Sequence, residues 1–68
     1  MQAFEIRSMS DGDIRTKIEE ISEEMFNLRF QKTIGQLKDP NRLTALKRDI
    51  ARLKTVLRER QLAAHQDN

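Results

Sequence analysis

A heptad pattern of leucine and isoleucine in residues 41–60 constrains this chain more than any other feature. The apolar residues recur at steps of three and four, at Leu43, Leu46, Ile50, Leu53 and Leu57. This spacing places one apolar seam along one side of an α-helix. Because a single helix in water leaves such a seam exposed, the pattern requires a partner helix.

A second heptad pattern lies earlier in the chain and supplies that partner. Its seam consists of Ile14, Ile18, Ile21, Met25 and Leu28. Ser10, with Asp13 three residues later, resembles a capping box and predicts the helix start. Asp39 is a favourable N-cap and Pro40 a favourable first residue for the following helix. We therefore expect a first long helix over about residues 10–36 and a second over about residues 40–62.

The short connection between these helices makes them antiparallel neighbours. The predicted fold is all-α: an antiparallel two-helix hairpin with long coiled-coil-like arms and a short N-terminal helical turn at about residues 3–8. A turn centred near Asp39 would set three facing pairs, namely Leu28 with Ile50, Met25 with Leu53, and Ile21 with Leu57. Phe4 and Ile6 are expected to pack over the open end of the hairpin. The 68 residues form one helical-hairpin domain, residues 1–68, whose tail at 63–68 is expected to fray.

Several classes of chemistry are excluded by what the chain lacks. It has no cysteine, and its one histidine, His65, lies in a polar tail. It contains no Gly-rich loop and no nucleophile beside a base. We therefore expect no enzyme activity, no metal site, no cofactor and no small-molecule substrate. The first residues, with Glu5 and no apolar run, predict no signal peptide, and no segment reaches the ~18–20 apolar residues of a membrane span. The expected location is the cytoplasm.

The second helix concentrates the positive charge of the chain. Residues 41–60 contain seven Lys or Arg against Asp49 and Glu59, a net +5, whereas the whole chain is only +2. The polar and basic residues away from the seam are Lys47, Arg48, Arg52, Lys54, Thr55 and Arg58, and Arg29 and Lys32 extend the charge along the first helix. Such a cluster can neutralise many phosphates. Because aromatic residues are scarce, we expect recognition of folded RNA by shape and backbone, unless these cations only keep the rod soluble.

Three apolar residues of the first helix lie away from its seam. Phe26, Phe30 and Leu37 recur at helical spacing on a different face. One interpretation is that a twist of the helix brings these side chains back into the hairpin. The other is a surface that becomes buried against another macromolecule.

Three blocks of this sequence resemble the bacterial large ribosomal subunit protein twenty-nine family. They are EMFNLRFQ at residues 24–31, TIGQL at residues 33–37 and KRDIARLKTVL at residues 47–57. The resemblance covers nearly the whole chain, although the opening residues AFEIR and SDGDI match more weakly. It implies a structural protein of the large ribosomal subunit that binds rRNA near the nascent-peptide exit tunnel. It also implies packing beside large-subunit protein twenty-three, with exit-tunnel targeting factors or chaperones as indirect partners.

The resemblance assigns RNA contact to the matching motif positions. These are Arg29, Gln31, Lys32, Gln36, Lys47, Arg48, Arg52, Lys54 and Thr55; the basic pattern adds Arg58. It also gives Phe26, Phe30 and Leu37 a burial partner, either rRNA or an adjoining protein. The alternative from a different class is a self-associating coiled-coil interaction module with no RNA role, in which the phenylalanines form the dimer face.

Overall fold

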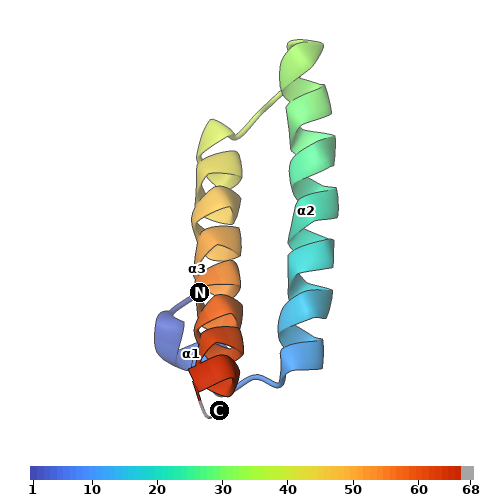
Figure 1. Cartoon of the computed structure of the whole chain (residues 1–68). Coiled ribbons are helices and arrows are strands. Elements are labelled where there is room, and N and C mark those ends of the chain that lie inside the picture. Colours follow the sequence, from blue (N-terminus) through green and yellow to red (C-terminus); the bar gives the residue numbers. More distant parts are fainter. Residues whose placement is uncertain (67–68) are drawn as a thin grey trace.

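The computed structural model describes residues 1–66, which form three helices (Figure 1). They are α1 (Ala3–Arg7), α2 (Asp11–Thr33) and α3 (Pro40–Gln66). α2 and α3 run antiparallel, and α1 packs against α3 on the side away from α2. The molecule is an elongated rod of 51 × 18 × 16 Å. The prediction of an all-α antiparallel hairpin with a short N-terminal helical turn is confirmed.

α2 begins with its predicted cap and ends earlier than predicted. The Asp13 backbone N–H donates to Ser10 Oγ at 3.1 Å. At the other end, Gly35 has a left-handed φ of 75°. The Gln36 N–H donates to the Gln31 carbonyl at 2.8 Å, and the Gly35 N–H donates to the Lys32 carbonyl at 3.1 Å. This Schellman motif ends the helix at Thr33 rather than near residue 36.

α3 begins at Pro40, as predicted, but extends beyond residue 62. Asp39 Oδ1 accepts the backbone N–H groups of Asn41 at 3.1 Å and Arg42 at 3.3 Å. The helix continues to Gln66 because Leu62 and the two alanines after it are strong helix formers with no Gly or Pro among them. The last two residues of the tail expected to fray, 67–68, lie outside the described residues.

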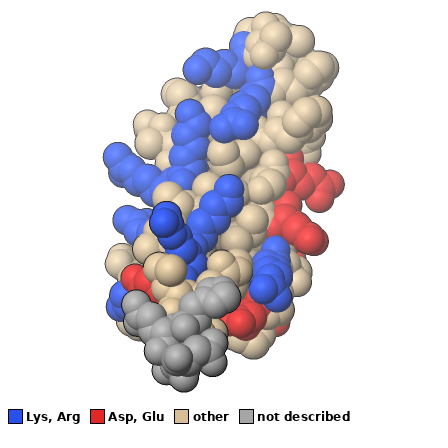
Figure 2. Space-filling model, in the orientation of Figure 1, with Lys and Arg blue, Asp and Glu red and all other residues tan. Residues whose placement is uncertain are grey.

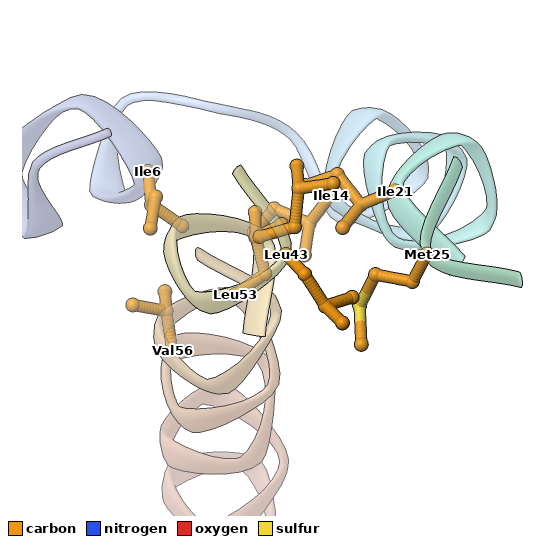
Figure 3. Packing of buried hydrophobic residues seen from close by; sticks show 8 residues of the cluster. Ile6, Ile14, Ile21, Met25, Leu43, Leu53 and Val56 are labelled. Carbon is orange, nitrogen blue, oxygen red and sulfur yellow. The ribbon is translucent and has the colours of Figure 1, made fainter. Parts of the chain in front are cut away.

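The core joins all three helices along α3 (Figure 3). Its buried residues are Ile6, Ile14, Ile21, Met25, Leu43, Leu46, Leu53 and Val56. Figure 3 shows Ile6 on α1 and Val56 on α3 on the side of α3 away from Met25. Val56 lies off the predicted seam, and it is buried because α1 covers a second side of α3. Phe4, which we expected to pack with Ile6, is instead 71% exposed.

The facing pairs predicted from a turn at Asp39 are wrong. Because α2 ends at Thr33 and α3 begins at Pro40, the midpoint of the connection lies between residues 36 and 37. Moving the midpoint from Asp39 to this position shifts the α3 partner of each α2 residue by more than one helical turn of ~3.6 residues. The ion pair between Glu24 and Arg42 shows this shift, because the predicted register places Lys54 opposite Glu24. Ile21 lines a groove with Leu46, and Met25 lines another with Ile50.

Candidate nucleic-acid interface

The side of α3 away from the core carries most of the exposed cations of this helix. At ~100° per residue, the predicted contact residues of α3 fall on two neighbouring strips of the helix. The first strip holds Lys47, Lys54 and Arg58, and the second holds Arg48, Arg52 and Thr55, all exposed. We call these six residues the basic arc. Figure 2 shows Lys and Arg side chains along the length of α3, with acidic side chains gathered toward α2 and the lower end.

An open groove between α2 and α3 adds a cation from the other helix. Arg29 of α2 lines this groove together with Lys47 and Lys54 of α3. Met25 and Ile50 are the apolar residues of its lining, and no carboxylate contributes to it. The hairpin therefore brings together three predicted contact residues that are up to 25 positions apart in the sequence.

The cations of the basic arc are mostly unpaired within the described residues. Lys47, Arg48, Lys54 and Arg58 have no carboxylate within the 4.0 Å of a salt bridge. Arg52 is the exception, because its Nη1 lies 3.6 Å from Asp49 Oδ1. The same Nη1 lies 3.4 Å from the carbonyl oxygen of Met1.

Thr55 is exposed, but its hydroxyl proton is already engaged in a hydrogen bond. Its hydroxyl donates to the Ala51 carbonyl at 2.8 Å, within the same helix. Phosphate oxygens accept hydrogen bonds, so a hydroxyl that already donates must give up this bond before it can contact one. We therefore rank Thr55 below the lysines and arginines of the basic arc.

The opposite side of α3 has its cations neutralised. Arg42 Nη2 lies 2.9 Å from Glu24 Oε2, and Arg60 Nη1 lies 2.6 Å from Asp11 Oδ1. Asp49 Oδ1 also lies 3.5 Å from the Met1 amino group. The net +5 of residues 41–60 is thus divided between a side where cations pair with acids and a side where they face solvent. The charge total can be counted from the sequence, whereas this division appears only in the folded structure.

The predicted contact residues near the turn lie apart from the basic arc. Gln31 and Gln36 line a different groove together with Leu28 and Leu37. Lys32 is exposed in the last turn of α2. The structure therefore divides the predicted RNA contacts between the basic arc with Arg29 and a second site at the turn.

The apolar residues that lie off the α2 seam also occupy two places, the exposed surface of α2 and the groove at the turn. Phe26 is 71% exposed and Phe30 is 60% exposed, so no twist returns them to the hairpin. Leu37 is only half-buried and lies in the non-helical connection, where it lines the turn groove. Ile34, at 49% exposed, follows Phe30 at helical spacing, a signal that the sequence already contained.

Neither a metal cluster nor a membrane span is found in the described part of the chain. Residues 1–64, whose side chains the structure describes, contain no group of three or more His, Cys, Asp or Glu side chains placed to hold a metal ion. Within residues 1–66, no helix is both long and apolar enough to cross a bilayer. The carboxylates that the structure brings near α3 act instead in the ion pairs described above.

Comparison with known proteins identifies close relatives along nearly the full chain. The family model described as Ribosomal L29 protein matches residues 4–60. Large ribosomal subunit protein uL29 of Natranaerobius thermophilus is 52% identical over 62 residues, which cover 91% of this chain and 95% of the relative. The protein of the same name from Geobacillus stearothermophilus is 49% identical over 65 residues, covering 96% and 98%. That of Persephonella marina is 44% identical over 63 residues, covering 93% of each.

Proposed function

The chain belongs to the ribosomal L29 protein family, and on this premise we propose that it binds rRNA of the large subunit through the basic arc and Arg29. The family consists of structural, non-enzymatic components of the large ribosomal subunit in the cytoplasm. Proteins with this role hold folded RNA segments together by neutralising the phosphates between them. We place the contact near the nascent-peptide exit tunnel, as the resemblance of the sequence blocks implies.

The separation of charge on α3 is the observation that supports RNA binding. Lys47, Arg48, Lys54 and Arg58 face solvent without acidic partners among the described residues, and Arg29 extends this surface onto α2. If the cations served only to keep the rod soluble, paired and unpaired cations would not need to lie on different sides of α3. An unneutralised strip along a straight rod instead suits the regular spacing of phosphates on an RNA backbone.

The exposed phenylalanines support a second contact, with a neighbouring protein. Phe26 and Phe30 are four residues apart, so they lie on one face of α2. Two aromatic side chains that are 71% and 60% exposed are typical anchors of a protein interface. We propose that this pair packs against large-subunit protein twenty-three, and that targeting factors or chaperones at the exit are reached indirectly through that neighbour.

The test is binding of the purified protein to a large-subunit rRNA fragment over a salt series, with an unrelated RNA as control. We expect preference for the rRNA fragment and an affinity that falls steeply with salt, because each phosphate contact releases counterions. Equal binding to both RNAs at every salt concentration would contradict a specific rRNA site.

The same exposed phenylalanines favour the alternative function, a self-associating module with no RNA role. Phe26 and Phe30 would then form the dimer face. Sedimentation of the isolated protein distinguishes the two functions, since we expect a monomer even at high concentration. A tight dimer that binds no RNA at low salt would favour the alternative.

A further inference from the structure

The turn between α2 and α3 forms an open groove that the basic arc does not reach. Its volume is about 660 Å³, within the ~300–1,000 Å³ typical of small-ligand clefts. Half-buried Leu28 and Leu37 supply its apolar lining, and Gln31 and Gln36 also line it. Building on the proposed function, we infer that this groove binds one unpaired nucleotide of the rRNA, with the base in the groove and its phosphate beside Lys38.

The chemistry of the groove fits a nucleobase. Each glutamine amide carries donors and an acceptor, the combination that reads the edge of a base. The leucines offer an apolar surface to the base plane. An unpaired base can leave its stack and present both its faces and its edge to such a site, whereas a paired base cannot.

Arg42 supplies a planar group at the same groove, and its orientation is restrained. Its Nη2 donates to Glu24 Oε2 at 2.9 Å and to Oε1 at 3.2 Å, while the side chain remains 52% exposed. Guanidinium planes are among the groups on which unpaired RNA bases stack. The ion pair with Glu24, which lines the neighbouring groove, therefore restrains the Arg42 guanidinium before RNA arrives.

The groove offers one unpaired cation to the phosphate of a nucleotide. Asp39 lines it too and keeps its negative charge, although its Oδ1 accepts the backbone N–H groups of Asn41 and Arg42. The Glu24 carboxylate is neutralised by Arg42. Lys38 lines the groove with no carboxylate within 4.0 Å among the described residues, so one cation is left for a phosphate.

Gly35 keeps this side of the turn open. Its φ of 75° belongs to the left-handed region, and a Cβ built on it would meet no atom within 4 Å. The glycine therefore lets the chain turn without a side chain that would project into the space beside the groove.

The experiment tests whether the two glutamines contact one particular unpaired nucleotide of the rRNA. The probe is the large-subunit rRNA fragment that the full chain binds, prepared with an abasic residue at each unpaired position in turn. We expect one abasic position to weaken binding by the unmodified protein about tenfold, the effect of losing one or two hydrogen bonds. The same position should weaken binding by the double variant Gln31→Ala with Gln36→Ala by a clearly smaller factor, because the hydrogen-bonding partners of the base are already missing and only its contacts with Arg42 and the leucines remain to be lost. Gln61→Ala, at an exposed position of α3, is the matched control and should behave as the unmodified protein.

Salt dependence separates this inference from the proposed function. The double glutamine variant removes no charge, so its salt slope should equal that of the unmodified protein while its affinity is lower at every salt concentration. Unchanged affinity, or equal abasic penalties in both proteins, overturns the nucleotide site and leaves RNA binding by the basic arc intact. Absence of salt-dependent binding in the unmodified protein overturns both.

A photocrosslink identifies the occupant within the assembled particle. A benzophenone amino acid at position 36, irradiated in large subunits, should crosslink to RNA at the nucleotide that the abasic series identifies. A crosslink to protein alone would overturn the assignment and show that a peptide segment occupies the groove.

Discussion

Arg42 Nη2 contacts both carboxylate oxygens of Glu24, at 2.9 and 3.2 Å, and this pair ties the first turn of α3 to the distal half of α2. A second cross-helix pair, Arg60 with Asp11 at 2.6 Å, lies at the open end of the hairpin. Together the two pairs define which turn of α2 lies beside which turn of α3. They also neutralise two arginine charges that would otherwise be free to pair with phosphates.

Glu24→Gln should lower the free energy of unfolding by about 0.2–1 kcal/mol, the range for exposed ion pairs. Both side chains of the pair are about half exposed, so solvent screens their attraction. The measurement is urea denaturation followed by circular dichroism. Glu23→Gln is the matched control, because Glu23 is exposed and has no cation within 4.0 Å among the described residues. Equal effects of the two substitutions would show that the Glu24–Arg42 pair contributes nothing to stability.

Ile6→Ala should destabilise the fold far more than Phe4→Ala, although both residues belong to α1. Ile6 is completely buried against α3, so its truncation should cost about 2–4 kcal/mol. Phe4 is 71% exposed, and its loss should change the free energy of unfolding by no more than about 0.5 kcal/mol. Thermal or urea unfolding of the two variants checks this, and a small effect of Ile6→Ala would mean that α1 is not docked on α3.

Substitution of the two glycines by alanine should have opposite effects on stability. Gly35→Ala forces a Cβ into the left-handed region at a φ of 75°, which should cost about 1 kcal/mol. Gly12 lies in the first turn of α2, where a Cβ would meet only Ser10 Oγ at an ordinary 3.9 Å. Gly12→Ala should therefore stabilise the protein by up to about 1 kcal/mol through helix propensity. The midpoints of thermal unfolding measure both, and a shift in the same direction would refute this interpretation.

Lys47→Gln combined with Lys54→Gln should reduce the salt dependence of rRNA binding. If each lysine contacts one phosphate, the slope of log affinity against log salt should become shallower by about two. The control pair, Arg15→Gln with Lys17→Gln, removes the same charge from α2, where Lys17 already lies 3.8 Å from Glu20. That control should change the slope by less than one. Equal changes for both pairs would mean that RNA responds only to net charge, with no contact at the groove that Arg29, Lys47 and Lys54 line.

The local features of the sequence determined the elements of this fold. Ser10 and Asp39 predicted the starts of α2 and α3, because an N-cap depends only on residues within the next turn. The heptad steps of Ile14 to Leu28 and of Leu43 to Leu57 predicted which faces pair, because helical periodicity is also local. Gly35 is visible in the sequence too, but its left-handed φ of 75°, which ends α2 before residue 36, appears only in the structure.

The tertiary structure alone decided the register, the second buried side of α3 and the distribution of charge. Periodicity identifies a face but is unchanged when one helix slides along the other, so the pairing of Glu24 with Arg42 could not be deduced from it. Val56 is buried because α1, more than 40 residues away, covers it. The sequence contains the basic residues of α3, but only the packed structure shows which arginines are neutralised across the hairpin and which cations remain for RNA.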